Sequence, residues 1–415
     1  MLDIQKIREN KAEIKKALLK RLAKVNLDKL INLDDQRKEI ITKVEVLKSK
    51  KNKASQTKPD TQTIKKMKSI GQDIKILEEK LKKVVQELKE KLIELPNIPA
   101  DDVLAGGSEN NKVIDTFGIG KSIFSLNEVE FKFTAHDHFK LATALKLIDY
   151  ERAVKMSGTG FWVYRGDGAL LEWALLNYFI DFHRKNNYTF IIPPFLLTEE
   201  SAYVSGHLPK FKDDLYWTKD KTCLNATSEM MLGNYHRDEI LKELPIKYYA
   251  FSPCFRREAG GYGAQEKGMI RGHQFNKIEM FIFSKPEDSW NMFDELLKNA
   301  QELLAGLDLH YQTVQLAAQD TSATMAKTID LEVYIPSMNK YKEVSSVSNA
   351  LDYQAQRGNI KYKEDGINKF VHTLNASGLA TSRIIPAILE QNQQKDGSVK
   401  IPEVLQKYMN KKVLK

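Results

Sequence analysis

The stretch FRREAGGYGAQEKGMIRGHQFNKIEM, from Phe255 to Met280, is the part of this chain that decides its fold. It begins with an Arg-x-Glu triplet, Arg256 to Glu258, and continues into a loop that contains several glycines. An alternating stretch of apolar and charged residues follows, from Ile270 to Phe283. This order predicts a strand, a loop and an antiparallel return strand. Neighbouring Arg and Glu side chains on a strand can bind a phosphate and an amino group together, whereas an ordinary hairpin would simply expose them to water.

The composition is that of a globular protein with a basic N-terminal part. The chain has 415 residues, of which 42% are hydrophobic and 29% charged, enough for two or three domains. Residues 1–100 hold 26 Lys and Arg against 15 Asp and Glu, whereas the remaining residues hold 38 against 40. This asymmetry favours a polyanion-binding appendage on a catalytic body, and it fits equally well with a solvated, lysine-rich helix surface.

Cysteine usage and hydropathy indicate a reducing, cytoplasmic compartment. The two cysteines, Cys223 and Cys254, belong to no Cys-x-x-Cys or Cys/His cluster, so we expect neither a disulfide framework nor a metal site of that kind. The N-terminus lacks the apolar core of a secretory signal. No run of about 18 apolar residues predicts a membrane span.

Residues 28–94 predict two long helices around Pro59. Apolar residues recur at steps of three and four from Ile64 to Leu92, which is the spacing of a coiled-coil seam. Pro59 and Asp60 predict a turn, with Thr61 or Thr63 as the N-cap of the second helix. The two helices should fold back as an antiparallel hairpin with arms of roughly 45 Å. A shorter amphipathic helix is expected over residues 3–25, before the hairpin.

The two prolines of LPNIP, residues 95–99, end the second helix. We therefore expect an N-terminal domain over residues 1–105 and a second domain over residues 106–415. The second domain mixes helical and strand patterns, which predicts an α+β fold with an antiparallel sheet flanked by helices. Helices are expected over residues 169–187, 286–306 and 380–393, and strands near residues 189–197, 247–255, 273–283, 329–335 and 341–347.

The second domain offers candidates for the activation of a carboxylic acid by ATP. Such a site needs cations on the triphosphate and a flat surface for the adenine. Arg256 can bridge a carboxylate and the α-phosphate, and Glu258 can accept from the adenine amine. Since alternate residues of a strand share a face, Phe275 and Glu279 should point into one pocket, with Phe275 as the adenine platform. Each residue alone is more often a surface charge or a core aromatic ring.

Two further tracts carry polar residues in suggestive places. In KEVSSVSN, residues 342–349, the alternation predicts Glu343 and Ser345 on one face of a strand, and Glu343 is a candidate Mg²⁺ ligand. In residues 371–390 we expect a turn at Asn375, Ser377 and Gly378. A helix should follow, with Arg383 near its start, where it can reach the γ-phosphate.

Together these tracts resemble the motifs of seryl-tRNA synthetases, which are class II aminoacyl-tRNA synthetases. The opening segment resembles motif 2 (about 250–283), and residues 170–194, a helix and then a strand that ends in proline, resemble motif 1. Residues 371–393 resemble motif 3. The resemblance extends over nearly all 415 residues, because further stretches are also similar: LPNIP, GTGFWVYRGDGALLEWAL, SGHLPKFKDDLYW and KEVSSVSN.

The resemblance implies a serine–tRNA ligase. Such an enzyme activates L-serine with ATP and Mg²⁺ to seryl-adenylate, releases pyrophosphate, and transfers serine to the 3′ end of tRNA(Ser). It leaves open whether tRNA(Sec) is also a substrate. Motif 1 implies a homodimer, and no membrane partner is expected. In the family the basic hairpin binds the long variable arm of the tRNA, and here the candidate contacts are Lys48, Lys50, Lys51, Lys53 and Lys58.

The same resemblance assigns roles to individual residues. It implies Arg256 and Arg383 as catalytic residues and Glu343 as a ligand of the Mg²⁺ that accompanies ATP. It implies serine binding by Thr227, Ser228, Glu229, Arg256, Glu279 and Ser377. It implies ATP binding by Arg256, Arg257, Glu258, Gly272, Phe275, Glu343, Val344, Ser345, Ser346 and Arg383.

The chain departs from the family pattern at three places. In the loop 263–268, Ala264 and Lys267 stand where the family usually has two arginines. Gly272 replaces a bulkier apolar residue, and Thr381-Ser382 replaces Val-Gly. Two alternatives therefore remain open: a non-catalytic tRNA-binding paralogue, and a divergent amino acid ligase of the same fold. Ligases of the second kind usually lack the long arm and bind zinc through Cys and His.

Overall fold

The structure, a computed structural model, describes the chain except for residues 23, 56–59, 119–123, 126–127, 130–132 and 259–267. Lys58 and the residues Ala264 to Lys267, which the sequence singled out, lie outside the described residues. The chain divides into two compact units, Met1–Asp101 and Asp102–Lys415.

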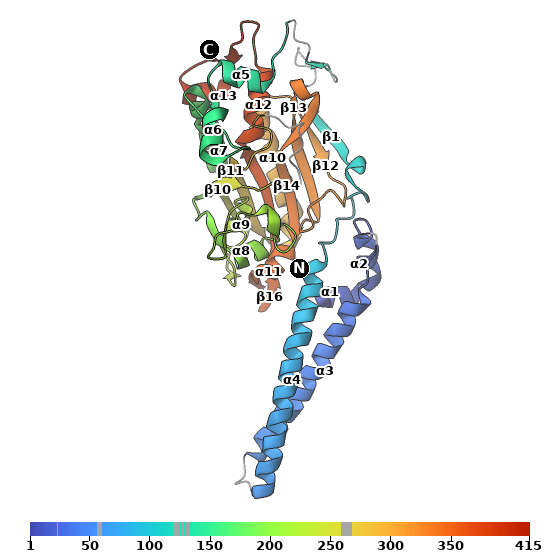
Figure 1. Cartoon of the computed structure of the whole chain (residues 1–415). Helices are drawn as coiled ribbons and strands as arrows, with labels where there is room; N and C mark the ends of the chain where they lie inside the picture. Colours follow the sequence, from blue (N-terminus) through green and yellow to red (C-terminus); the bar gives the residue numbers. More distant parts are fainter. Residues whose placement is uncertain (23, 56–59, 119–123, 126–127, 130–132, 259–267) are drawn as a thin grey trace. The chain divides into compact units, whose positions relative to one another are not determined.

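The regular elements described in the first unit are all helices. Its helices are α1 (Ile4–Glu9), α2 (Lys11–Leu18), α3 (Asp28–Ala54) and α4 (Thr61–Glu94), drawn in blue in Figure 1. The prediction of one helix over residues 3–25 is wrong, because the backbone of Asn10 leaves the helical region (φ −122°, ψ 34°) and separates α1 from α2. Asparagine favours such breaks, since its side chain competes with the helix for backbone hydrogen bonds.

The predicted hairpin is formed by α3 and α4, which pack against each other along their apolar stripes. The buried residues of the seam are Leu30, Leu33, Ile40, Val44, Ile74, Val84, Leu88 and Leu92. The N-cap of α4 is Asp60, whose carboxylate accepts from the Thr63 N–H at 2.7 Å. The prediction of Thr61 or Thr63 as the cap is therefore wrong. A carboxylate also interacts favourably with the positive end of the helix dipole.

A buried carboxylate on α3 holds α1 in place. Asp34 is fully buried, and it accepts from the Nε atoms of Arg8 and Arg37, each at 2.9 Å. Lys38 lies 3.1 Å from its second oxygen. Burial by itself would raise the pKa of Asp34, but the hydrogen bonds from these three cations outweigh it and lower the pKa from 3.8 to about 2.

This lowered pKa predicts an acid-sensitive α1–α3 contact. The charged form of Asp34 stabilises the folded state above about pH 4, and this stabilisation is lost as the pH falls from about 4 to 2. We expect Asp34→Asn to lower the free energy of local opening of α1 by about 2 kcal/mol at pH 7. Hydrogen exchange of the α1 amides in the full chain measures this quantity.

The matched control is Asp35→Asn, since Asp35 also pairs with Arg8 but its side chain is 58% exposed. Its effect should stay below about 0.5 kcal/mol because exposed ion pairs contribute little. Equal effects of the two substitutions would contradict the role of Asp34.

The second unit is organised around an eight-stranded sheet in which every neighbouring pair is antiparallel except β6 and β10. The predicted α+β class with an antiparallel sheet is thereby confirmed. Strand order across the sheet is β1 (Lys112–Phe117), β12 (Tyr311–Gln315), β13 (Lys327–Ile335), β14 (Lys340–Leu351), β17 (His372–Ala380), β11 (Gln274–Ser284), β10 (Ile246–Phe255) and β6 (Thr189–Ile191). The segment 255–280 thus enters the sheet on β10 and returns on the adjacent strand β11, as predicted.

The remaining elements are helices and short strands around this sheet (Figure 1). The helices are α5 (His138–Ala144), α6 (Tyr150–Ser157), α7 (Asp167–Lys185), α8 (Glu199–Val204), α9 (Glu229–Leu232), α10 (Ser289–Gly306), α11 (Tyr353–Gly358), α12 (Thr381–Gln391) and α13 (Glu403–Met409). The short strands are β2 (Phe124–Ser125), β3 (Glu128–Val129), β4 (Ile148–Asp149), β5 (Val163–Tyr164), β7 (Leu196–Thr198), β8 (Thr222–Leu224), β9 (Ile240–Leu241), β15 (Lys361–Glu364), β16 (Ile367–Phe370), β18 (Val399–Lys400) and β19 (Val413–Leu414).

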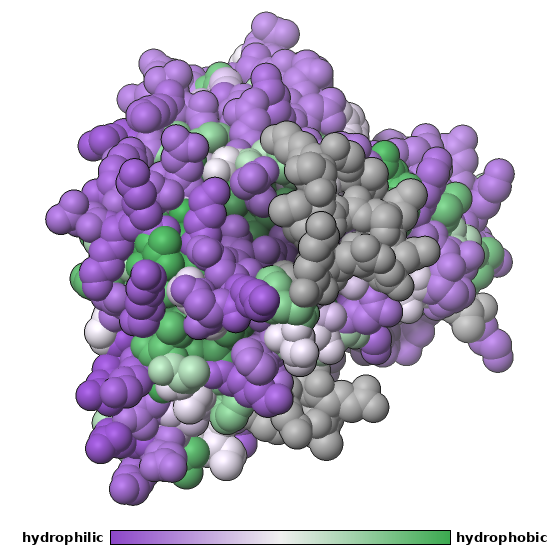
Figure 2. All heavy atoms as spheres, turned by 90° about the horizontal axis from the view of Figure 1, so that it is seen from above, coloured by the Kyte–Doolittle hydropathy of each residue, from purple (hydrophilic) through white to green (hydrophobic). Residues whose placement is uncertain are grey.

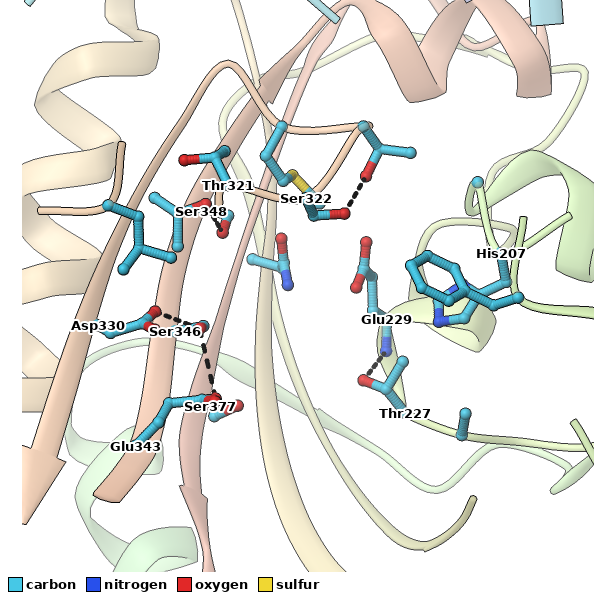
Figure 3. Close-up of a pocket in the computed structure, with 18 of the residues that line it drawn as sticks. His207, Thr227, Glu229, Thr321, Ser322, Asp330, Glu343, Ser346, Ser348 and Ser377 are labelled. Carbon is cyan, nitrogen blue, oxygen red and sulfur yellow. Dashed lines mark hydrogen bonds between the residues drawn. The ribbon is translucent and has the colours of Figure 1, made fainter. Parts of the chain in front are cut away.

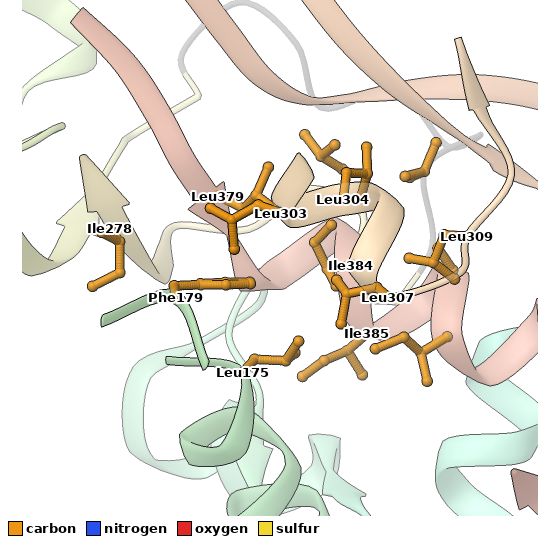
Figure 4. Packing of buried hydrophobic residues seen from close by; sticks show 14 of the residues in the cluster. Leu175, Phe179, Ile278, Leu303, Leu304, Leu307, Leu309, Leu379, Ile384 and Ile385 are labelled. Atoms are coloured by element: carbon orange, nitrogen blue, oxygen red, sulfur yellow. The ribbon is translucent and has the colours of Figure 1, made fainter. Parts of the chain in front are cut away.

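Strand β11 separates the hydrophobic core from the polar face of the sheet. Its residues Ile278, Met280 and Ile282 lie in the main core, together with apolar residues of α7, α10 and α12. Figure 4 shows this packing, with Phe179 of α7 and Ile278 among the labelled side chains. Because strand side chains alternate, Lys277 and Glu279 point to the opposite face. The core therefore fixes which face of the sheet presents the charged residues.

Three strands of the eight-stranded sheet were not expected from the sequence. They are β1, β12 and β17, and β17 contains Asn375, Ser377 and Gly378. The prediction of a turn at these three residues is wrong, because β17 pairs with β14 on one side and β11 on the other. Gly378 serves close packing, since a Cβ atom there would lie 2.3 Å from Nε2 of His183. The sheet partners override the local turn preference.

The surface agrees with the high share of charged residues. Figure 2 shows one mostly hydrophilic face with hydrophobic residues gathered in small groups. Within the described parts of the chain, no helix combines the length and the apolar character that crossing a membrane requires.

Candidate functional site

A cavity of about 740 Å³ lies on the polar face of the sheet. Figure 3 shows Glu343, Ser346 and Ser377 on one side of it and Thr227, Glu229 and His207 on the other. Glu343 and Ser346 belong to β14, and Ser377 belongs to β17. Thr227 lies just before α9, Glu229 is the first residue of α9, and His207 follows α8. The cavity therefore lies between the rigid sheet and the segments that cover it.

The floor of the cavity is a buried ion pair between Lys277 and Glu279. Lys277 also donates to Oγ1 of Thr227 at 2.8 Å. The second oxygen of Glu279 accepts from Asn375 Nδ2 at 3.2 Å. Buried charges are stable only when they are paired and hydrogen-bonded, and this network meets that requirement. The network therefore presents a positive and a negative side chain, Lys277 and Glu279, at the surface of the cavity.

Glu229 adds a second carboxylate beside this network. It begins α9, is nearly fully buried and accepts from Nε2 of Gln354 at 2.6 Å. Burial, followed by repulsion from the Glu279 carboxylate, raises the pKa of Glu229 to about 7. Two carboxylates that repel each other make a favourable position for an ammonium group.

Arg256 and Phe275 lie together at the boundary of the cavity. The Arg256 guanidinium lies 5.2 Å from the centre of the Phe275 ring, and its Nε donates to the carbonyl of Ala226 at 3.3 Å. Glu258 forms an ion pair with Arg271 next to them. The prediction that Phe275 and Glu279 share a face of β11 agrees with this arrangement, because Lys277 between them lines the cavity on the same side.

Strand β14 differs from the prediction because it contains a bulge. Its register against β13 shifts at Val344: Ser345 pairs with Leu331, but Glu343 pairs with Glu332. One extra residue reverses the alternation, so Glu343 and Ser346 line the cavity while Ser345 is buried. The prediction that Glu343 and Ser345 share a face is therefore wrong.

A second, smaller pocket adjoins the cavity and shares Arg256, Lys277 and Glu343 with it. Its other walls include Gly272, Phe275, Val344, Ser382 and Arg383. Arg383 donates to the carbonyl of Glu343 at 2.6 Å and to that of Ile270 at 3.1 Å. These contacts leave a cation at the start of α12, where the helix dipole also favours anions.

The structure gives a reason for Gly272. A Cβ atom at this position would lie 2.1 Å from the Trp162 ring. Trp162 therefore occupies the space that a larger side chain at position 272 would need.

Three of the predicted site residues, Ser228, Arg257 and Ser345, line neither pocket. The hydroxyl of Ser228 is hydrogen-bonded to that of Ser252 at 2.7 Å, and Ser345 donates to the carbonyl of Ser377 at 2.6 Å. The guanidinium of Arg257 lies over the Tyr216 ring at 5.9 Å. Of these three contacts, only the bond from Ser345 reaches a residue that lines the cavity, Ser377.

The sequence analysis did not single out Lys277, Asn375, Asp330 or His207 as site residues, although all four line the cavity. Lys277 could have been found, since it lies between Phe275 and Glu279 in the same alternation. His207 gives no pattern by itself. Burial, together with nearby Arg256 and Lys277, lowers its pKa to about 3, so it is neutral at physiological pH.

The lysines predicted to bind tRNA lie in the first unit. Lys48, Lys50, Lys51 and Lys53 are exposed along the last turns of α3. Lys48 pairs with Glu78 of α4 at 2.8 Å.

Comparison with known proteins agrees with both units. The family model for the tRNA synthetase class II core domain (G, H, P, S and T) matches residues 210–392. The model for the seryl-tRNA synthetase N-terminal domain matches residues 1–99. The sheet, the cavity and these matches define a class II aminoacyl-tRNA synthetase.

Individual relatives narrow the assignment. The chain is 50% identical to serine–tRNA ligase 2 of Clostridium acetobutylicum over 99% of both chains, and 43% identical to the serine–tRNA ligase of Petrotoga mobilis over the full length of both. The crystal structure of seryl-tRNA synthetase from Pyrococcus horikoshii complexed with ATP has a TM-score of 0.92 at 33% identity, covering 100% of this chain and 99% of that one.

The chain belongs to the seryl-tRNA synthetase family, whose curated members are serine–tRNA ligases. The resemblance stated from the sequence is confirmed. Neither the non-catalytic paralogue nor the divergent ligase is favoured by these relatives.

Proposed function

We propose that this chain joins L-serine to tRNA(Ser) in two steps at the described cavity. In the first step a carboxylate oxygen of serine attacks the α-phosphorus of ATP, and the bond to pyrophosphate breaks. In the second step the terminal ribose hydroxyl of the tRNA attacks the carbonyl carbon of seryl-adenylate, and AMP leaves. No protein nucleophile is needed, because the site positions the reactants and stabilises developing charge.

The observation that carries this proposal is the buried network of Lys277, Glu279 and Thr227 beside Glu229. It offers carboxylates for an ammonium group and fixed hydrogen-bond partners for a hydroxyl in one small space. A site that hydrogen-bonds a substrate hydroxyl rejects the analogue without it, since the buried polar groups are then left unpaired. We assign serine binding to this network together with Arg256 and Ser377.

We assign ATP to the adjoining pocket. Phe275 offers a flat surface for the adenine, and Glu258 lines the same pocket. Arg256 is shared by both pockets, so it is placed to bridge the serine carboxylate and the α-phosphate. Arg383 at the start of α12 supplies a cation for the γ-phosphate.

The carboxylates of β13 and β14 suit the Mg²⁺ that the family implies. Ser346 donates to Asp330 and to Glu343, which gives three hard oxygen donors at one edge of the cavity. Burial and the neighbouring Glu343 raise the pKa of Asp330, and a divalent cation would relieve that repulsion. Bound there by Glu343 and Ser346, Mg²⁺ would neutralise charge on the phosphates.

Mg²⁺ usually keeps waters and phosphate oxygens among its ligands. In the residues that the structure describes, no three or more His, Cys, Asp or Glu side chains gather to hold a metal ion. Glu343 and Ser346 would therefore supply only part of the coordination.

We assign tRNA binding to residues 1–105, with Lys48, Lys50, Lys51, Lys53 and Lys58 as phosphate contacts. A long lysine-rich rod suits an RNA helix, which is recognised mostly by shape, phosphates and 2′-hydroxyls. We propose that the reaction takes place in the cytoplasm.

We propose a homodimer that forms through α7 and β6. Apolar side chains with 51–69% exposure lie on or directly after these elements: Leu170, Trp173 and Ile192. Exposed apolar patches of this kind often mark subunit contacts.

The activity itself is tested by pyrophosphate exchange with serine, threonine, alanine and glycine, followed by charging of tRNA. We expect exchange with serine at least about a hundredfold above exchange with alanine, and charging of tRNA(Ser). Absence of exchange with all four amino acids would refute the ligase proposal. Exchange with serine but no charging would favour the divergent ligase.

The raised pKa of Glu229 predicts a pH dependence for serine alone. Glu229 is protonated below about pH 7 and charged above it, and the charged form binds an ammonium group better. We expect kcat/KM for serine to rise through pH 7, and we expect this rise to depend on Glu229 whatever the pH profile of KM for ATP. Glu229→Gln should flatten the serine profile. An unchanged profile in that variant would contradict the assignment.

The assignment of tRNA binding to the hairpin of α3 and α4 leads to a separate prediction. Replacing residues 30–90 by a short linker should leave exchange intact and abolish charging, because the cavity lies entirely in the second unit. In the full chain, changing Lys48, Lys50, Lys51 and Lys53 to Glu should raise KM for tRNA and weaken its salt dependence. Charging that survives the deletion would rule out the role of the arm.

A further inference from the structure

Glu172 is a buried carboxylate that the reaction described above does not use. It lies on α7 with 3% exposure, and its Oε1 accepts from Asn276 Nδ2 and from Thr381 Oγ1, each at 2.7 Å. Its Oε2 has no hydrogen-bond partner. Among the described residues, no Arg, Lys or His forms an ion pair with it. A carboxylate kept in such a place needs an explanation, because burial without a cation is unfavourable.

The two partners of Glu172 are sequence neighbours of residues that line the smaller pocket. Asn276 follows Phe275 on β11, and Thr381 opens α12 two residues before Arg383. Phe275 and Arg383 both line that pocket. One carboxylate oxygen therefore joins the proposed adenine platform to the segment that carries the proposed γ-phosphate cation.

The backbone does not make this connection by itself. The ladder between β11 and β17 ends at the pair Lys277 and Ala380, where the chain turns into α12. Next to the turn, Leu379 has φ +131°, a conformation that persists only when its surroundings hold it. Beyond the ladder, Thr381 Oγ1 also lies 3.2 Å from the carbonyl of Asn276, so side chains continue the link.

We propose that Glu172 is a positioning residue for ATP, which fixes the separation between Phe275 and Arg383 through its bonds to Asn276 and Thr381. The proposal rests on the assignment of the smaller pocket to ATP. The bond from Thr381 to Glu172 holds the segment in which Ser382 and Arg383 lie on the pocket wall.

The bonds from Asn276 and Thr381 to Glu172 should be stronger when the Glu172 carboxylate is charged. Burial raises its pKa to about 7, while the hydrogen bonds from Thr381 and Asn276 and the nearby Tyr164 hydroxyl act in the opposite direction. These three side chains, from α12, β11 and β5, are the groups that face it, and burial keeps the Tyr164 phenol neutral by raising its pKa. Charged acceptors form stronger hydrogen bonds, so the link should loosen as the pH falls through 7.

The first test compares two isosteric substitutions of buried threonines at the two ends of β17. Thr381→Val removes a donor to Glu172, whereas Thr373→Val removes a donor to Gln354, which contacts Glu229. We expect Thr381→Val to raise KM for ATP in serine-dependent pyrophosphate exchange roughly tenfold and to leave KM for serine within about twofold. Thr373→Val should leave KM for ATP within about twofold. Equal effects of both on KM for ATP would overturn the proposal.

The second test uses Glu172→Gln, which keeps one oxygen acceptor and cannot ionise. We expect its KM for ATP to be constant between pH 6 and 8, at the value that the unmodified chain has at the acid end. A variant that keeps the pH dependence of the unmodified chain would sink the proposal. Thermal unfolding of each variant separates loss of folding from loss of positioning. No exchange by the unmodified chain would overturn the proposed function and this inference together.

Discussion

The buried pair of Lys277 and Glu279 is the interaction on which the site depends. Both charges are removed from water on the polar face of β11, and each needs its partner to remain there. Thr227 and Asn375 complete the hydrogen bonding from two other parts of the chain. The pair therefore couples the floor of the cavity, the β17 strand and the segment before α9 into one rigid unit. Such preorganisation suits catalysis by positioning.

The alternation of β11 explains how the sheet supplies both core and chemistry. Ile278, Met280 and Ile282 commit one face to the packing of α7, α10 and α12. The other face carries Lys277 and Glu279 and then, farther along the strand, Phe281 and Phe283 of a second hydrophobic cluster. The bulge at Val344 performs a related task on β14, since it turns Glu343 and Ser346 together toward the cavity. Strand register thus decides which residues meet a substrate.

Much of the fold could be predicted from local patterns. The hairpin of α3 and α4 follows from a long periodic seam, and the return of β10 into β11 follows from alternation on both sides of a loop. Features set by tertiary partners could not. The sequence Asn375 to Gly378 has the composition of a turn, yet two neighbouring strands hold it extended. Asn10 breaks a helix that periodicity alone would continue.

The site shows the same division. Residues with a motif, such as Arg256, Glu279 and Arg383, could be named from the sequence, and the structure places them around two adjoining pockets. A bulge has no reliable sequence signal, so the face of Ser345 could not be foreseen. Lys277 and Glu172 gain their meaning only from burial and from partners distant in sequence. The roles proposed for these two residues are therefore argued from their contacts and not from a sequence motif.

The central claim, that the Lys277–Glu279 network with Glu229 forms a serine-specific site, is tested most directly by equilibrium binding of two stable sulfamoyl analogues to the intact protein. One analogue carries serine joined to adenosine, and the other carries alanine in its place. Because loss of the hydroxyl leaves buried polar groups unpaired, the seryl analogue should bind at least about a hundredfold more tightly. Equal affinity for the two analogues would contradict the account.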